Sequence, residues 1–550
     1  MEQLLIKCYI YIKFLFLDNL MKRFFLFSCI IVFLTTTILA QTSTYKITKV
    51  NYNLTGCGPK FLGTTKPFAL DKNVEVNKNK IFDTQEELDS YIKDYELRLN
   101  NTRVFEKVLV SYNYEIDTNN STSNIIPVTL DVVLQDSIHI LALPYPKYSS
   151  NEGFMLKLKI KDTNFLGSMN EMNTALNFKL EQKSESEKPH PSFGFEFGYD
   201  FPFKTGIFAS TLVNDYAFSY TAGDESPEWK IKTGYELSYP TERIEYTLGF
   251  YQSFNRDFDY LEFNDKTYAG EEILFKMPVV IAEIPNFSKI KYTPYIDFVI
   301  NWDLNKINIE NSTLSSPYLE IGHSISLNRV NWKDQLRTGI DATLSNYFKY
   351  NFQRNILYPE ISLETKVYKS LPLLPTKNFM NRFGICADFY SFFDIYNYNN
   401  KYFKNDGTNI GERIRGLRDN QYLNTSGYED WYALQTPAAI ILNLDFPIHI
   451  FQTNFQSKFI KYFNFDFQIS PFLDIALTYN KATKNWFNPK DGLYAGGIEV
   501  LVYPLKWSSF TVRGSVGLDL GRYIFADKLN SDWRQNCSKY EISFGIGLHY

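Results

Sequence analysis

The sequence predicts a mainly β protein, in which a 16-stranded antiparallel transmembrane β-barrel follows one small α+β domain. Three observations lead to this prediction. An export signal stands near the amino terminus, no later window is apolar enough for a membrane helix, and short alternating stretches run to the last residue. If the chain spans a membrane without apolar helices, it must do so as a closed barrel, because lipid offers no partners for unpaired backbone groups.

The composition agrees with strands and narrows the class of protein. Aromatic residues make up 17% of the chain, with 47 Phe and 40 Tyr against 7 Trp, and aromatic side chains suit a pleated sheet. A genome-wide codon bias explains part of this excess, but not where the aromatics fall. The net charge of −4 argues against a nucleic-acid partner. The 5 Cys lack Cys-x-x-Cys spacing, so we expect no disulfide framework, metal or cofactor.

Residues 1–40 have the layout of a secretory signal peptide. A basic Met21-Lys22-Arg23 precedes an apolar run from Phe24 to Leu34, and Ala40 stands at the expected cut. Met21 is therefore an alternative start of the protein. A lipoprotein signal with Cys29 as the modified residue is disfavoured, because too few apolar residues precede it.

Residues 44–136 have the mixed pattern of a small α+β domain. Tyr45 to Leu54 reads as a strand, and Asp83 is placed as the N-cap of an amphipathic helix that ends near Leu99. The period then changes to two, which predicts a β-hairpin. Its two strands are residues 108–116 and 128–134.

Residues 138–550 show strand after strand. Residues 193–201 place aromatics on one face, and residues 235–250 read as strand, tight turn and strand. At about 26 residues per strand and connection, this segment makes about sixteen strands, within two. A soluble β-sandwich would give the same alternation, but a single sandwich of this length exceeds the usual domain size.

The last strand has the form of an outer-membrane sorting signal. Its apolar side chains face one way and its polar or small ones the other, and the chain ends on an aromatic residue. The residues that match the signal are Ser543, Gly545, Leu548 and Tyr550.

A long polar loop carries three arginines within six residues, between Gly411 and Asp419. The ordinary interpretation is a solvated charged loop. However, Asp474 lies on a strand where it would point into the barrel, opposite to its apolar neighbours. An arginine that reaches into a confined lumen needs an acidic partner, and a carboxylate can accept two bonds from it. We therefore expect Arg415 and Asp474 to form a pair.

These residues resemble the outer-membrane insertase superfamily typified by BamA and TamA. That family carries a Val/Ile-Arg-Gly-aromatic/apolar motif on a loop folded into the barrel, and a Phe/Gly-x-Asp-x-Gly motif on the wall strand that meets it. The loop motif is matched by Ile414, Arg415, Gly416 and Leu417, and the strand motif by Phe472, Asp474 and Ala476. Leu417 and Ala476 depart from the commonest residues of the family. A rival motif, Val512-Arg513-Gly514, lies within a strand and is interpreted as a coincidence.

The resemblance implies that residues 44–136 are one periplasmic polypeptide-transport-associated (POTRA) domain and that residues 138–550 form a barrel in the outer membrane. The five histidines are scattered and no nucleophile or metal-ligand motif appears, so we do not expect an enzyme, although hydrolases with a barrel fold exist. The resemblance implies a factor that assembles or inserts outer-membrane proteins, capturing client strands with its periplasmic domain and templating them at the barrel seam. Expected partners are unfolded outer-membrane clients and lipids, with accessory periplasmic or lipoprotein subunits left open. A translocation pore that exports a dedicated partner, and a passive porin, remain alternatives. The family usually carries several such domains, whereas only one fits here.

Overall fold

The computed structural model describes residues 44–58, 63–114, 125–149, 153–181, 190–223, 226–256, 267–284, 287–303, 317–352, 355–372, 380–394, 408–417, 435–458, 460–480, 484–524 and 540–548. The predicted signal peptide and Tyr550 lie outside these residues. Contacts divide the chain into two compact units. The first contains the described residues of Met1–Asn51 with Asn77–Ile92 and Ser111–Asp131, and the second contains those of Tyr52–Val76, Lys93–Val110 and Val132–Tyr550.

A four-stranded sheet of order β2-β1-β4-β3 stands at the amino-terminal end of the described chain. Its chain order is strand, helix, short strand, helix, strand, strand, as expected for an α+β domain. The elements are β1 (Thr44–Thr55), α2 (Pro67–Asn73), β2 (Ile81–Phe82), α3 (Gln85–Asn101), β3 (Phe105–Tyr114) and β4 (Ile125–Asp136). The apolar face of α3 is buried, at the helical spacing that the sequence shows; its residues are Leu88, Ile92, Tyr95 and Leu99.

Two details of the helices differ from the sequence prediction. The helix α3 is capped by Thr84 and not by Asp83, because Glu87 N donates to Thr84 Oγ1 at 3.2 Å, while Asp83 N donates to the Glu87 carboxylate. The helix α2 was not predicted, although Pro67 stands at its start, where proline is well tolerated. None of the described helices is long and apolar enough to cross a membrane.

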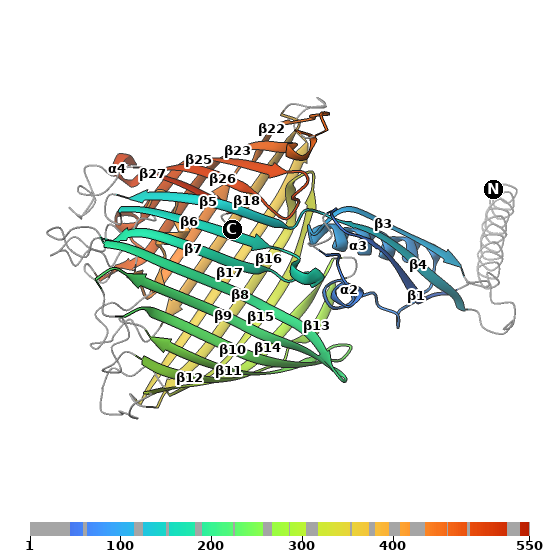
Figure 1. Cartoon of the computed structure of the whole chain (residues 1–550), viewed down its shortest axis with the longest axis horizontal. Coiled ribbons are helices and arrows are strands. Elements are labelled where there is room, and N and C mark those ends of the chain that lie inside the picture. Colours follow the sequence, from blue (N-terminus) through green and yellow to red (C-terminus); the bar gives the residue numbers. More distant parts are fainter. Residues whose placement is uncertain are drawn as a thin grey trace, which may run out of the picture. The chain divides into compact units, whose positions relative to one another are not determined.

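The rest of the described chain forms one closed antiparallel barrel (Figure 1). Twenty-one strands stand in its order, but β13, β22 and β24 are short continuations of β12, β21 and β25. When these continuations are joined, the described barrel has 18 strands around its wall, the upper limit of the predicted sixteen within two. The number is higher because a strand with its connection is on average shorter than the length assumed in the prediction.

The elements of this part of the chain are β5 (Ile140–Ser149), β6 (Gly153–Asp162), β7 (Met172–Glu181), β8 (His190–Thr205), β9 (Phe208–Thr221), β10 (Glu228–Pro240), β11 (Glu245–Arg256), β12 (Thr267–Lys276), β13 (Val279–Ile284), β14 (Ser288–Asp303), β15 (Tyr318–Lys333), β16 (Leu336–Asn351), β17 (Ile356–Pro372), β18 (Arg382–Asp394), β19 (Thr408–Asn409), β20 (Gln435–Thr436), β21 (Ala438–Asp445), β22 (Ile448–Gln452), β23 (Phe465–Asn480), β24 (Asn485–Trp486), β25 (Leu493–Pro504), β26 (Val512–Asp519), α4 (Gly521–Ile524) and β27 (Tyr540–Ile546). The strands β19 and β20 form a separate two-stranded sheet and are not part of the barrel wall.

The wall has one apolar and one polar face. On β17 the exposed large apolar residues include Leu357, Ile361 and Val367, whereas Glu360 and Glu364 occupy the intervening positions of the opposite parity. Because successive side chains of a strand point to opposite faces, the apolar set faces outward and the charged set inward. An outward apolar band with a polar interior is the pattern of a membrane barrel.

The hairpin predicted at residues 235–250 is present. Tyr239 pairs with Tyr246 across β10 and β11, and Thr241 N donates to Ile244 O at 2.7 Å in the tight turn. Its strands extend further in both directions than the alternation indicates, because pairing with β9 and β12 continues each of them.

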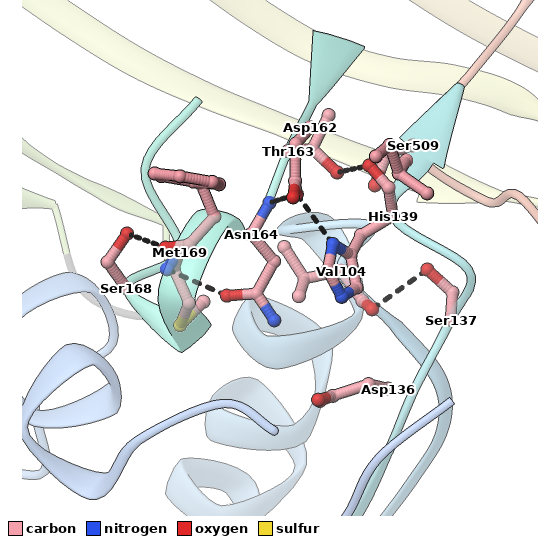
Figure 2. A network of polar contacts seen from close by, with 12 residues as sticks. Val104, Asp136, Ser137, His139, Asp162, Thr163, Asn164, Ser168, Met169 and Ser509 are labelled. Carbon is pink, nitrogen blue, oxygen red and sulfur yellow. Dashed lines mark hydrogen bonds and ion pairs between the residues drawn. The ribbon is translucent and has the colours of Figure 1, made fainter. Parts of the chain in front are cut away.

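Within the second unit, the chain between β4 and β5 is tied to its surroundings by hydrogen bonds (Figure 2). Ser137 donates from its backbone N and its Oγ to Val104 O, at 2.8 and 2.9 Å. His139 Nδ1 lies 2.5 Å from Asp162 Oδ1, and Asp162 Oδ1 also accepts from Asn164 N at 2.9 Å. Because these groups are buried, each needs such a partner.

Candidate functional site

A short segment from the loop between β18 and β21 lies against the inner face of the barrel. Its described residues are 408–417, and Ile410, Ile414 and Leu417 are buried. The strands β23 and β25 contact it with their buried face, whereas Ile498 on the opposite face of β25 is 53% exposed. The outward face is the apolar and exposed one, so this segment lies inside the barrel wall.

A β-turn shapes the carboxy-terminal end of the described segment. Leu417 N donates to Ile414 O at 3.2 Å, which closes a turn with Arg415 and Gly416 at its centre. Gly416 has φ +93°, a value that L side chains rarely adopt. A Cβ at Gly416 would also lie 2.9 Å from the backbone of Gly517 on β26. The motif therefore requires glycine for both conformation and space.

This turn directs Arg415 onto Asp474 of β23. Arg415 donates from its backbone N (2.9 Å) and Nε (3.0 Å) to Asp474 Oδ2, and from Nη2 to Oδ1 (2.7 Å). Arg415 is 2% exposed and Asp474 is fully buried. The two residues that the sequence analysis paired are thus brought together by a two-point contact with an additional backbone bond.

Two further carboxylates surround the same guanidinium. Arg415 Nη1 donates to Asp445 Oδ1 at 2.6 Å and lies 3.6 Å from Glu499 Oε2. The Glu499 carboxylate also accepts from Arg513 Nη1 at 3.3 Å. The guanidinium lies 3.8 Å from the centre of the Phe472 ring, a cation–π contact. We call this group the latch cluster; its members are Arg415, Asp445, Asp474, Glu499 and Arg513. Its two arginines and three carboxylates give it a formal net charge of −1.

An apolar cluster surrounds the polar contact. It joins the loop to the wall strands β18, β21, β23 and β25, and the buried members are Phe392, Ile410, Ile414, Leu417, Ala439, Ile441, Ala476, Leu493 and Ala495. The methyl group of Ala476 takes part in this packing. Leu417 is 1% exposed and fills a space in the same cluster.

The neighbouring Arg413 is held less tightly than Arg415. Its Nη2 donates to Glu364 Oε1 at 3.2 Å, its guanidinium lies 3.7 Å from the centre of the Tyr390 ring, and its side chain is 31% exposed. The carbonyl of Arg413 accepts from Asn443 Nδ2 at 2.7 Å. Arg413 thus offers a matched comparison for Arg415 in the same segment.

The carboxy-terminal residues of the predicted sorting signal lie on and just after β27, the strand that pairs with the strand of Arg513. Ser543 Oγ lies 2.6 Å from Ser515 Oγ, and Gly545 pairs with Arg513 across β26 and β27. Leu548 follows the end of β27, and Tyr550 lies outside the described residues.

Sequence reasoning missed Asp445, Glu499 and the part played by Arg513. Asp445 and Glu499 are each the single charged residue of a largely apolar strand, and Arg513 shares β26 with one other charged residue, Asp519; all three have the parity of the buried face. That isolation was the available signal. The motif Val512-Arg513-Gly514, taken as a coincidence, places Arg513 next to Glu499, so its arginine belongs to the latch cluster.

Comparisons with known proteins give weak structural similarity. No protein-family model and no curated protein matches the sequence. Among solved structures, CdiB from Acinetobacter baumannii is 10% identical, with 92% of this chain and 74% of that chain covered and a TM-score of 0.45. BamA from Haemophilus ducreyi lacking POTRA domains 1–3 is 14% identical, with 91% and 84% covered and a TM-score of 0.32. CdiB from Escherichia coli is 9% identical, with 92% and 90% covered and a TM-score of 0.37. Similarity of this degree assigns no function.

The architecture and the site define the class of protein. The chain is mainly β, with a large closed antiparallel barrel that follows a small mixed α+β domain. Inside the wall, a loop segment is fixed by a buried arginine among three carboxylates.

Proposed function

We propose that this chain is an outer-membrane barrel that moves polypeptide, and that its loop segment 408–417 is a displaceable latch on the inner wall. Passage of a partner chain through the lumen is the function that the loop geometry supports best. The observation that carries this proposal is the contact of one loop residue, Arg415, with carboxylates from three wall strands.

The physical reasoning concerns how such a contact breaks. Ion pairs and hydrogen bonds are reversible, so a client that offers competing contacts can lift the segment without covalent chemistry. Barrels of 16 to 18 strands are wide enough to leave an aqueous channel when their interior is not filled by loops. A barrel of 18 strands with a displaceable inner segment therefore fits a gated channel better than a barrel whose lumen is permanently closed.

Conductance in planar lipid bilayers tests this proposal with the full chain. The Arg415→Ala protein should show longer or more frequent open states than the wild type, whereas Arg413→Ala should behave as wild type. Conductance of Arg415→Ala that equals that of the wild type would contradict the latch. A wild-type protein that is already fully open would favour the passive porin.

Insertion of client proteins at the barrel seam is the second candidate, and a feature of β5 supports it. His139 O accepts from Thr163 N on the β6 side at 2.9 Å, whereas Ile138 N donates to Lys506 O at 2.9 Å. Ile140 O likewise accepts from Trp507 Nε1 at 3.2 Å. Backbone groups of successive strand residues point to opposite sides, so the even-numbered residues at the start of β5 face away from β6.

Pro144 and Pro146 have the same parity and therefore face β27, the last strand, which follows β5 around the barrel. Proline has no backbone N–H, so the seam lacks two donors. A weakened first-to-last seam could open and template the strands of a client.

Restoring the donors separates the two functions. With Pro144→Ala and Pro146→Ala together, a seam-dependent insertase should assemble fewer outer-membrane clients in cells, whereas lumen passage should be unchanged. The seam of the double variant should also resist thermal opening in detergent. Unchanged assembly of clients with a demonstrably tighter seam would eliminate insertion.

The remaining assignments are part of the same proposal. Residues 44–136 are proposed as one POTRA-like periplasmic domain and residues 138–550 as the barrel, with unfolded clients or a dedicated partner chain on the periplasmic side. The alternative interpretation of the loop motif was a solvated charged loop. It does not account for the burial of Arg415. Depleting the protein and recording which outer-membrane and secreted proteins disappear would identify the client.

A further inference from the structure

Aromatic rings on the outward face of β8 continue to the carboxy-terminal end of this strand. Tyr199, Phe201 and Phe203 follow one another on the outward face, with ring centres 6.1 and 6.0 Å apart, and Phe203 lies 5.9 Å from Tyr235 of β10. This end of β8 leads into the tight turn at Gly206. Short turns join the strands of membrane barrels at one membrane interface, so the turn at Gly206 puts this end of β8 at such an interface.

An open pocket of about 320 Å³ lies beside this aromatic row. Within the second unit, it is lined by residues of α2, of the turn after β6 and of β8. Its apolar walls include Phe68, Leu166, Tyr199 and Phe203, and its charged rim is Lys66 and Lys204. Both lysines are exposed, and neither has an ion-pair partner among the described residues.

Hydrogen bonds hold the backbone beside the pocket in place. Lys66 N donates to Gly167 O at 2.9 Å, and Asn164 Nδ2 donates to Thr65 Oγ1 at 2.8 Å. A Cβ at Gly167 would lie 2.2 Å from Thr64 O, so the two segments meet backbone to backbone. The pocket is therefore held open by buried hydrogen bonds and not by the side chains that line it.

Leu166 has an unusual conformation for its position. Its φ and ψ are 56° and 20°, in the left-handed region, and its side chain is 50% exposed. Such a conformation costs a non-glycine residue free energy, and it persists where the surroundings impose it. Here the turn presents an exposed leucine at the pocket, which favours contact with an apolar ligand.

We propose that this pocket binds a phospholipid with an anionic headgroup, its phosphate between Lys66 and Lys204 and part of an acyl chain along the aromatic wall. A lysine at the interface can extend its ammonium group to the headgroups while its methylenes cover apolar surface. A soluble phosphate would use the lysines but leave the apolar walls wet, so the mixed lining fits an amphiphile. The inference requires the barrel to lie in a membrane and does not depend on the latch or on the client.

Native mass spectrometry of the full chain tests the site. The protein is released from nanodiscs of phosphatidylglycerol or of phosphatidylcholine, and the retained lipids are counted. The Lys66→Gln, Lys204→Gln double variant should retain phosphatidylglycerol about tenfold less than the wild type, since each lysine near the surface contributes a several-fold attraction for anionic lipid. Lys490→Gln, at an exposed lysine far along the chain, is the matched control.

Further outcomes decide between the possible ligands. Leu166→Gly, which relieves the left-handed strain, should also reduce lipid retention, because the apolar contact is lost while both charges stay. Equal retention of phosphatidylglycerol by the wild type and the double lysine variant would overturn the proposal. Competition by glycerol phosphate as strong as by the lipid would overturn it as well, because the site would then select the phosphate alone. Conductance of the variants should match that of the wild type, which separates a failure here from a failure of the latch.

Discussion

Removal of Arg415 should release the loop segment more completely than removal of Asp474. In Arg415→Ala three buried carboxylates lose their shared cation, with Arg513 the remaining member of the latch cluster that carries positive charge. Loss of one partner from a buried ion pair costs about 3–5 kcal/mol. In Asp474→Ala the guanidinium keeps Asp445 and Glu499, so the loss should be about 1.5–3 kcal/mol, the range for charged hydrogen bonds.

Limited proteolysis of the full chain in detergent or nanodiscs measures the release. Cleavage within the loop should be fastest for Arg415→Ala, intermediate for Asp474→Ala and slowest for the wild type. The double variant should be cleaved no faster than Arg415→Ala, because Arg415→Ala already removes the contact that Asp474→Ala removes. Arg415→Lys should protect only partly, since lysine keeps the charge but loses the planar fork.

Arg413→Ala is the control for this series. Arg413 stands two residues away in the same segment, but its side chain is partly exposed, both its Nη atoms share one oxygen of Glu364, and Asp388 is 3.8 Å away, so the loss should stay within about 1 kcal/mol. Strictly additive losses for Arg415→Ala and Asp474→Ala, or equal effects of Arg413→Ala and Arg415→Ala, would refute the reasoning.

Three further predictions follow from particular residues. Gly416→Ala and Gly517→Ala should each unseat the loop, because a Cβ at either position meets the other's backbone at 2.9 or 2.7 Å; an unchanged protease pattern would contradict the close approach. Burial raises the pKa of Asp136, although Thr65 donates two bonds to it, so its contribution to stability is present below the pKa of the unfolded chain and is lost as the pH rises through the folded pKa. Thermal unfolding of Asp136→Asn should therefore show a flatter dependence on pH above about 4 than the wild type. Replacing Tyr550 by Asp should lower the amount of protein in the outer membrane, as immunoblots of membrane fractions would show, and undiminished levels would count against the sorting signal.

The residues that the sequence could identify were those with a local signature. Alternation of apolar and polar residues predicted the hairpin at β10 and β11, because a strand's two faces meet different surroundings wherever it lies in the wall. The N-cap of α3 is Thr84, one residue later than predicted. Asp83 and Thr84 both suit an N-cap, and only the position at which the helix starts selects one of them. The strand count came from an assumed average length, which single sequences do not constrain closely.

The sequence by itself determined the class of fold. The alternation of apolar and polar residues, the composition and the lack of long apolar windows can all be read along the chain without knowing which segments meet in space. The sequence also singled out Arg415 and Asp474, because a cluster of arginines in a loop and a charged residue inside an apolar strand are both visible without a structure. Only the tertiary structure decided that Asp445, Glu499 and Arg513 join them, because strands β21, β23, β25 and β26 are brought together by pairing between segments distant in sequence. The pocket beside β8 arises in the same way, from α2, a turn and a strand whose meeting no local pattern records.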